Sequence, residues 1–248
     1  MEYQFIDWQS KDGAARLTLN RPPLNIINIA MLNELGSALE VIARDESLKV
    51  MVVQAEGKMF SAGVDVADHT ADKVGEMIPL FNRVCDVLSN FPTPTLAVVQ
   101  GHALGGGCEI AVCCDLIIAA EAANFAQPEI KLATIAPIAA MRLPGLIGYR
   151  RAAELLFTGD PIGAAEAAKV GLINRAVPIE QLDQAVDQLI DKLTKLSGSA
   201  LRLCKRALRV NTLAAMEKLY LNELMSTADT VEGLTAFMEK RAPLWKNR

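Results

Sequence analysis

The sequence predicts an α/β core followed by an all-helical C-terminal region. Up to about residue 178, short apolar runs alternate with stretches in which apolar residues recur at helical spacing. Buried strands that alternate with helices are typical of α/β folds, in which both faces of the sheet are covered. Beyond Val177 the apolar residues recur at helical spacing alone. We therefore divide the chain into a core, residues 1–178, and a helical region, residues 179–248.

The strands of the core are predicted from two kinds of pattern. Residues 15–19 alternate apolar and polar side chains, as a strand with one solvent-facing side does, and Pro22-Pro23 ends this segment. Continuous short apolar runs predict buried strands at residues 50–53, 95–99 and 116–119.

The helices are predicted from apolar residues that recur at i, i+3 and i+4. In the core they cover residues 30–44, 74–88 and 108–113, and the pattern is clearest in the second of these. In the C-terminal region they cover residues 182–193, 200–224 and 230–240.

Composition limits the class of protein. The 248 residues are 51% apolar and carry a net charge of −4, which fits a large globular domain and excludes a disordered or collagen-like chain. The acidic balance argues against a nucleic-acid partner, because such proteins usually carry a basic face. The densest basic stretch, Arg202, Lys205, Arg206 and Arg209, has helical spacing, and we interpret it as the solvated face of a helix.

Five cysteines without a CxxC pair predict a reduced, cytoplasmic protein. Imidazole ligands could come only from His69 and His102, and neither is near a cysteine cluster, so we expect no metal site. Residues 1–10 lack the apolar segment of a secretory signal. The longest apolar run, residues 110–120, is interrupted by Asp115 and is too short to cross a bilayer, so no membrane partner is expected.

A glycine run follows the strand that is predicted at residues 95–99. It lies in the stretch Gly101-His102-Ala103-Leu104-Gly105-Gly106-Gly107-Cys108-Glu109. It lacks the lysine of a phosphate-binding P-loop and the third glycine of a dinucleotide fingerprint. Glycines let a ligand approach the backbone, and free N–H groups at the start of the helix that follows would favour an anion or an oxygen that becomes one. A tight strand-to-helix turn explains the glycines equally well.

Two glutamates accompany this run. Glu109 lies in the predicted first turn of the helix, and Glu129 follows in a predicted loop. Two carboxylates beside an anion-stabilising backbone would make an acid–base site around an activated carbonyl. Alternatively, Glu109 only complements the helix dipole.

At these residues the chain resembles the crotonase, or enoyl-CoA hydratase/isomerase, superfamily. The resemblance extends over nearly the whole chain and rests on many motifs in the same order: Leu19-Asn20-Arg21-Pro22, Phe60-Ser61-Ala62-Gly63-Val64-Asp65, the stretch from Gly101 to Glu109, Cys114-Asp115-Leu116, Gln127-Pro128-Glu129-Ile130, Leu156-Phe157-Thr158-Gly159, Glu166-Ala167, Gly171-Leu172-Ile173-Asn174, Glu232-Gly233 and Phe237-Met238-Glu239-Lys240-Arg241. It implies a spiral of strand-strand-helix units. It further implies a C-terminal helical part used in trimer contacts, and trimers that commonly pair into hexamers.

The resemblance also implies roles for individual residues. The backbone N–H groups of Val64 and Gly106 match the family's oxyanion hole, which binds the thioester oxygen of an acyl-CoA. Glu109 and Glu129 match the two catalytic glutamates of the hydratases, and having both favours hydration over isomerisation. No cofactor is implied, because CoA is part of the substrate.

Further positions match the family's contacts to CoA. Lys58 matches a basic residue near the CoA phosphates, and Lys240 matches one that reaches the CoA of a neighbouring subunit. Ala62 and Asp65 lie in the same substrate-binding loop, where we expect Asp65 to form a turn or cap rather than to take part in catalysis. Hydratases often place another lysine where this chain has Ala67, so part of the phosphate contact is missing.

One departure from the family concerns the acyl pocket. Typical fatty-acid enoyl-CoA hydratases continue after the second glutamate with a Gly-Ala-Gly-Gly run, whereas this chain has no glycine in residues 134–144 and has Pro137 there. This stretch, with residues 22–27 and 64–70, is similar to the branch of the family that hydrates a cyclic dienoyl thioester, cyclohexa-1,5-diene-1-carbonyl-CoA. His69 lies in residues 64–70 and is expected to be a polar residue of a surface loop.

Other readings of the sequence remain open. A general short-chain 2-enoyl-CoA hydratase is the nearest alternative, and an isomerase is disfavoured by the paired glutamates. Some relatives bind RNA, but residues 30–44 contain no lysine and one arginine. A scaffold without catalytic activity would have no need of both glutamates and the glycine run.

Overall fold

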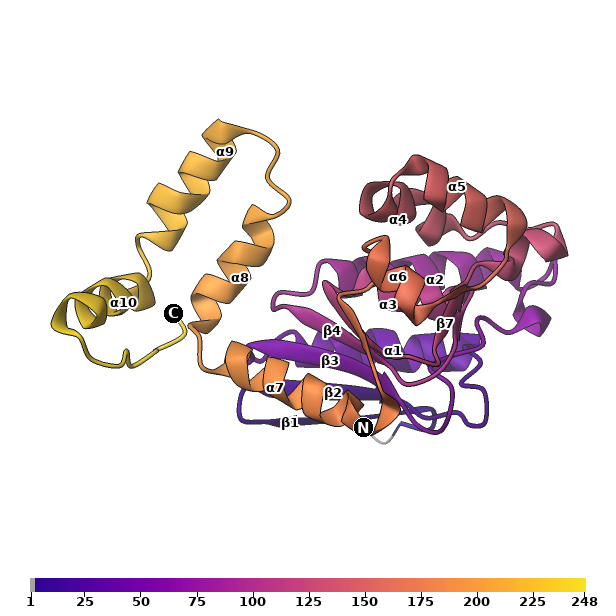
Figure 1. The fold of residues 1–248 in the computed structure, drawn as a ribbon, viewed down its shortest axis with the longest axis horizontal. Helices are drawn as coiled ribbons and strands as arrows, with labels where there is room; N and C mark the ends of the chain where they lie inside the picture. Colours follow the sequence, from indigo (N-terminus) through magenta and orange to yellow (C-terminus); the bar gives the residue numbers. More distant parts are fainter. Residues whose placement is uncertain (1–2) are drawn as a thin grey trace.

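The computed structural model describes residues 3–248, and a six-stranded sheet forms its centre (Figure 1). The strand order is β1-β2-β3-β4-β6-β9. The bounds are β1 Ile6–Lys11, β2 Ala14–Leu19, β3 Val50–Ala55, β4 Thr95–Val99, β6 Leu116–Ala120 and β9 Arg175–Val177. The edge strand β1 is antiparallel to β2, and the other neighbours are parallel.

A second, smaller sheet lies beside the first and consists of β5 Ala103–Leu104, β7 Asn124–Ala126 and β8 Ile162–Gly163. Isolated bridges join Ser61 to Ala103 and Ile27 to Val64, so the loops after β2 and β3 run alongside this small sheet. Successive turns of the chain therefore place one segment in the large sheet and one beside or in the small sheet, and then form a helix. This arrangement is the predicted α/β spiral of strand-strand-helix units.

Helices cover both faces of the large sheet. The helices α1 Ile29–Ile42, α2 Val74–Ser89 and α3 Gly106–Cys113 pack on one face, and α7 Leu182–Thr194 packs on the other. Alternate side chains of one strand point to opposite faces of the sheet. In β3, Met51 and Val53 pack in the main core, whereas Val52 packs in the cluster under α7. Parallel strands with both faces covered read as continuous apolar runs, which is why β3, β4 and β6 were recognisable in the sequence.

Three further helices, α4 Pro137–Ile147, α5 Tyr149–Thr158 and α6 Ala164–Lys169, complete the core. The sequence patterns did not predict α4, α5, α6, β1 or the strands of the small sheet. The prediction that Glu129 lies in a loop is wrong, because residues Pro128–Leu132 form a 3-10 helix. The strands of the small sheet have two or three residues each, which is too few for a periodic pattern to reveal them.

The C-terminal helices α8 Gly198–Ala207, α9 Leu213–Lys218 and α10 Ala228–Glu239 extend away from the sheet (Figure 1, orange to yellow). The prediction of one helix over residues 200–224 is wrong. The first helix ends at Ala207, and Thr212 adopts an extended conformation and caps the next one, its hydroxyl accepting a hydrogen bond from the N–H of Ala215. A π-helical turn, Leu219–Leu224, follows α9. Within residues 3–248, no helix combines the length and the apolar character needed to cross a membrane.

Candidate active site

The glycine run lies between β5 and α3, and a different neighbour occupies the space beside each glycine. Gly105 has φ +52°, and the carboxylate of Glu129 lies where a side chain at Gly105 would begin. A Cβ on Gly106 would lie 2.5 Å from Cγ2 of Val64, and one on Gly107 would lie 2.6 Å from Cβ of Ser61. These contacts require glycine at all three positions, and they bring Glu129 and Val64 next to the start of α3.

Two backbone N–H groups at this point are free to bind a ligand. Gly106 is the first residue of α3, where N–H groups have no partner within the helix. The loop that carries Val64 is held by Ile27, whose N–H donates to the carbonyl of Gly63 (2.9 Å) and whose carbonyl accepts from the N–H of Asp65 (2.8 Å). Among residues 3–248, no backbone acceptor is found for the N–H groups of Val64 and Gly106, and the Val64 side chain lies against Gly106.

Glu109 lies in the first turn of α3 and its side chain is buried. Its Oε1 accepts a hydrogen bond of 2.9 Å from the backbone N–H of Ala139, near the beginning of α4. Burial among apolar side chains raises the pKa of Glu109 to about 8, although the N–H groups of Ala139 and Ile138 oppose this change. At neutral pH this carboxyl group can therefore hold a proton and donate it.

Glu129 lies in the 3-10 helix between β7 and α4, beside the glycine run. Its Oε2 is buried and has no hydrogen-bond partner among the described residues. Burial raises the pKa of this carboxyl group as well, and the positive charge of His69 opposes the increase. The structure thus brings together the four residues to which the sequence assigned the chemistry: Val64, Gly106, Glu109 and Glu129.

The donor that orients Glu109 was missed by sequence reasoning. Pro137 stands in the first turn of α4, where its missing N–H costs nothing, so the following N–H groups are the free donors of the helix end. Pro137 therefore fixes where α4 begins, and its position in the sequence was the available signal. The residues without glycine thus form the first turn of α4, and the N–H of Ala139 in this turn donates to Glu109.

The remaining predicted positions differ in their surroundings. Asp65 caps the short 3-10 helix Val66–Asp68, with Oδ1 accepting from the N–H of Ala67 (3.1 Å), as expected of a turn-forming residue. Ala62 is half-buried and its N–H donates to the carbonyl of Leu24 (2.9 Å). Lys58 is exposed and begins the loop that leads to Val64.

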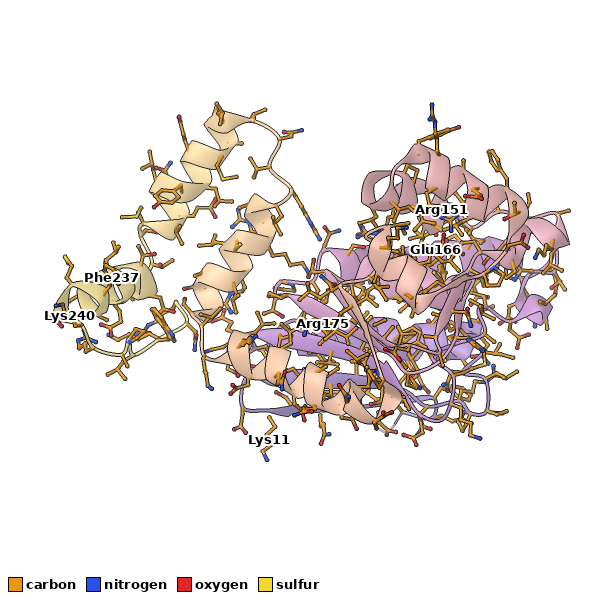
Figure 2. The ribbon with its side chains drawn as sticks, viewed as in Figure 1. Lys11, Arg151, Glu166, Arg175, Phe237 and Lys240 are labelled. Carbon is orange, nitrogen blue, oxygen red and sulfur yellow. The ribbon has the colours of Figure 1, made fainter. Side chains whose placement is uncertain are left out.

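Lys240 does not belong to the site of its own subunit. It is exposed and follows α10, at the far end of the C-terminal helices from the core (Figure 2). The helices α8 and α9 separate it from α3 and α4 in this view.

His69 lies in a bend directly after the short 3-10 helix Val66–Asp68 and is half-buried. Its ring Nδ1 lies 3.2 Å from the carbonyl oxygen of Asp65.

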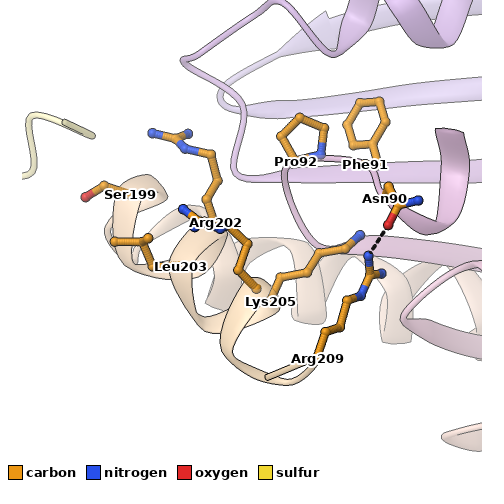
Figure 3. A pocket seen from close by; sticks show the side chains of 9 residues that line it. Asn90, Phe91, Pro92, Ser199, Arg202, Leu203, Lys205 and Arg209 are labelled. Carbon is orange, nitrogen blue, oxygen red and sulfur yellow. Dashed lines mark hydrogen bonds between the residues drawn. The ribbon is translucent and has the colours of Figure 1, made fainter. Parts of the chain in front are cut away.

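A cavity of about 300 Å³ beside α8 is lined by the basic stretch Arg202, Lys205, Arg206 and Arg209 (Figure 3). The prediction that these side chains form a solvated face is wrong for Lys205, which is 5% exposed and pairs with Asp115 at 2.6 Å. The other three donate to Asn90, Glu223 or backbone carbonyls. Lys205 and Arg206 thus pair with carboxylates, whereas Arg202 and Arg209 donate to neutral oxygens.

Comparisons with known proteins agree with this geometry. A sequence model of the family described as enoyl-CoA hydratase/isomerase matches residues 9–248. Cyclohexa-1,5-dienecarbonyl-CoA hydratase from Thauera aromatica is 38% identical over 250 residues, 97% of this chain and 96% of that protein. A probable enoyl-CoA hydratase from Mycobacterium bovis is 34% identical, with 100% of both chains covered.

Solved structures show the same fold. The structure of an enoyl-CoA hydratase subunit from Geobacillus kaustophilus gives a TM-score of 0.92 at 34% identity, with 100% of both chains covered. An enoyl-CoA hydratase structure from Bacillus anthracis gives a TM-score of 0.93 at 32% identity and covers 99% of this chain and 100% of its own.

Proposed function

Because the chain belongs to the enoyl-CoA hydratase/isomerase family and is an enzyme of the hydratase type, we propose that it hydrates cyclohexa-1,5-diene-1-carbonyl-CoA to 6-hydroxycyclohex-1-ene-1-carbonyl-CoA. The observation that carries this proposal is the meeting of two protonatable glutamates with two free N–H groups. Similarity over 97% of the chain to a hydratase named for this diene supports the choice of substrate.

The thioester oxygen accepts hydrogen bonds from the N–H groups of Val64 and Gly106. Attack of water on the ring carbon β to the thioester moves negative charge onto that oxygen, and the two donors stabilise it. Removing one such donor typically slows a reaction by about 10²–10³-fold. Both donors are backbone N–H groups, so the contact with the thioester oxygen does not depend on which side chain residue 64 carries.

The two glutamates divide the proton transfers. Ionised Glu129 accepts a proton from the attacking water, whose hydroxyl bonds to the β carbon. The resulting dienolate takes a proton from Glu109 at the ring carbon opposite the new hydroxyl, which leaves one ring double bond conjugated to the thioester. The net change is addition of one water, and proton exchange with solvent restores the starting state of both carboxyl groups. The deeper burial of Glu109, which raises the pKa of its carboxyl group to about 8, supports this assignment.

The wall beside Glu109 supports a ring rather than a linear chain. The first turn of α4 presents Pro137, Ile138 and buried Ala139 where other hydratases have a glycine run. These side chains fill the wall of the acyl pocket beside Glu109 and make it rigid. A flat ring needs no extended channel there, whereas a long linear acyl chain does.

A paired assay tests the proposal. The purified protein receives crotonyl-CoA in one reaction and cyclohexa-1,5-diene-1-carbonyl-CoA in the other, and mass spectrometry detects the gain of one water. We expect a much larger kcat/KM for the cyclic diene, and a loss of about 10²–10⁴-fold in Glu129→Gln. A preference for crotonyl-CoA would instead support the general short-chain hydratase, and turnover of neither would contradict both.

The proposal includes the partners implied by the family. The enzyme acts on acyl-CoA thioesters in the cytoplasm and assembles as a homotrimer or a dimer of trimers. Lys58 contacts the CoA of its own subunit, with Ala62 and Asp65 in the same loop, and Lys240 contacts the CoA of a neighbour. The exposed position of Lys240 beyond α8 and α9 supports a contact between subunits (Figure 2).

A further inference from the structure

Two hydrogen bonds from α4 hold α3, the helix that begins at Gly106 and carries Glu109. In the first turn of α3, the carboxyl group of Glu109 accepts the backbone N–H of Ala139 at 2.9 Å. In its last turn, the carbonyl of Val112 accepts the Nε–H of Arg142, also at 2.9 Å. Both the donors on α4 and the acceptors on α3 are three residues apart, so each pair lies on one face of its helix. The two bonds therefore fix the register of α4 along α3.

The Arg142 side chain binds an end of α3 that needs a partner. The carbonyl of Val112 is one of the last four of the helix, which have no acceptor role within it. A cation at this end also interacts favourably with the helix dipole. Nη1 of the same guanidinium donates to Oγ of Ser89, the last residue of α2, at 3.2 Å. One side chain of α4 thus joins the C-terminal ends of α2 and α3.

The guanidinium acts here through its hydrogen bonds rather than through an ion pair. Its partners in residues 3–248 are the neutral oxygens of Val112 and Ser89, and no carboxylate of this part of the chain pairs with it. Arg142 is half-buried and lines a cavity of about 410 Å³ together with Arg209. A planar fork of donors can bind two acceptors at once in fixed directions, which a lysine cannot do.

The start of α4 controls the ionisation of Glu109. The N–H groups of Ala139 and Ile138 lower the pKa of this carboxyl group, whereas burial and the charge of Glu129 raise it. A shift of α4 away from α3 would therefore leave burial unopposed. Further ionisable groups on these elements are Cys85 and Asp86 of α2, Cys108 and Cys113 of α3, and Arg142 of α4.

We propose that Arg142 is a positioning residue for the acid of the reaction, because it ties α4 to the end of α3 and so holds the N–H of Ala139 on the carboxyl group of Glu109. This inference rests on the proposed function and deepens it, since it adds the group that keeps Glu109 in place. Arg142 acts through one turn of α4 and does not touch the substrate.

The direct test follows the ionisation of Glu109 without any substrate. Protein labelled with ¹³C at the side-chain carboxyl groups of glutamate is titrated by NMR, and the Glu109 signal is identified by its loss in Glu109→Gln. In Arg142→Gln the midpoint should rise by about 0.5–1 pH unit, since a donor that favoured the charged form has moved away. The amide hydrogen of Ala139 should also exchange faster with solvent. An unchanged midpoint would overturn the inference.

Two variants separate positioning from charge. Arg209→Gln removes the other guanidinium of the cavity, whose hydrogen bonds go to Asn90 and Ser89, and should leave the Glu109 midpoint unchanged. Arg142→Lys keeps the positive charge but loses the fork, so at least half of the rise should remain. A complete return to the original midpoint with lysine would mean that charge alone matters, and would overturn the positioning role. If Arg142→Gln fails to fold, the lysine variant decides by the same criterion.

The kinetic test uses the cyclic diene. In Arg142→Gln the alkaline limb of the kcat/KM profile should move upward in pH by the same amount as the midpoint. At pH 7 the rate should fall by about 10–10²-fold, because the acid is displaced from its place beside the substrate. In the Glu109→Gln background, Arg142→Gln should cause little further loss.

Two outcomes separate this inference from the proposed function. A raised Glu109 midpoint with an alkaline limb that stays in place would overturn the link between Arg142 and catalysis. If the enzyme hydrated neither thioester, the proposed function would fail, whereas the titration would still show whether Arg142 positions α4 on Glu109.

Discussion

At the scale of single residues, the site depends on three glycines, which have no side chain to fill the space beside them. Each glycine of the run leaves a space that a different group fills: the Glu129 carboxylate at Gly105, the Val64 side chain at Gly106 and Ser61 at Gly107. The glycines thus act less as flexible points than as places where three segments of the chain meet the start of α3. A methyl group at any of them would move part of the site.

Gly106→Ala should therefore lose activity. Its Cβ would lie 2.5 Å from Val64 and 3.2 Å from the ring of Phe81, so the Val64 loop must shift away from the donor pair. We expect kcat/KM to fall by about 10²–10³-fold, the cost of losing one oxyanion donor. Gly75→Ala, in α2 where no atom lies within 4 Å, is the matched control and should change stability by less than about 1 kcal/mol and leave activity intact. Equal rates in the two variants would contradict the packing argument.

The rate should depend on pH in a bell shape. In the proposed mechanism Glu129 is ionised and Glu109 is protonated, so kcat/KM should rise as Glu129 loses its proton and fall as Glu109 loses its own. Because burial raises the pKa of Glu109 to about 8, the alkaline limb should lie near pH 8. Glu109→Gln should abolish this limb in whatever activity remains. A rate that stayed constant from pH 7 to pH 10 would show that Glu109 is not the acid. The measurement is kcat/KM across this range with the cyclic diene.

At the scale of elements, the start of α4 supplies the partner of Glu109. A helix end offers several free N–H groups, and here the N–H of Ala139 donates to the carboxyl group at 2.9 Å. In the proposed function the same short segment also forms the wall beside the acyl group, so a change there is expected to alter both specificity and catalysis.

A buried ion pair attaches α8 to the large sheet. Lys205 pairs with Asp115 at 2.6 Å and donates to the carbonyl of Thr93 at 3.1 Å, and Asp115 also accepts from Thr95. Burial lowers the pKa of Lys205, while Asp115 opposes that change, so the cation depends on its partner.

Lys205→Met should lower the free energy of unfolding by about 3 kcal/mol, because Asp115 would lose its cation while remaining partly buried. Lys195→Met removes an exposed pair with Asp191 and should cost less than about 1 kcal/mol. Chemical denaturation of both variants at the same protein concentration measures the difference. Similar values would mean that the pair at Lys205 contributes no more than a surface pair.

At the scale of the whole molecule, the C-terminal helices carry apolar side chains that the chain itself does not cover. Phe237 is 83% exposed and Met238 73%, both on α10. Exposed apolar surface of this kind marks a contact with another protein, and a second copy of the chain fits the proposed trimer.

Phe237→Glu should therefore weaken the assembly. Sedimentation velocity of the unaltered protein is expected to show a trimer or a hexamer, and the variant should shift towards the 26.8 kDa monomer. Lys11→Glu, on the edge strand β1 away from α10, is the control and should sediment as the unaltered protein does (Figure 2). A monomeric unaltered protein would contradict the proposed assembly, and with it the role of Lys240.

The longer strands and amphipathic helices, and the residue types of the site, could be predicted from the sequence. Buried strands produce apolar runs and amphipathic helices produce a 3.6-residue period, so β4 at Thr95–Val99 and α2 at Val74–Ser89 were recognisable from neighbours in the chain. The glycine run and the two glutamates were visible for the same reason, and the resemblance to a family supplied the spiral.

The tertiary structure alone decided which of these groups meet. The hydrogen bond of Glu109 to Ala139 joins residues 30 positions apart, and Lys205 donates to Thr93 across 112 positions. Local periodicity holds no information about such distances, so Lys205 was misread as solvated. Burial changes the cost of a charge, and burial is a property of the folded chain. The role of Lys205 could therefore be derived only from the structure.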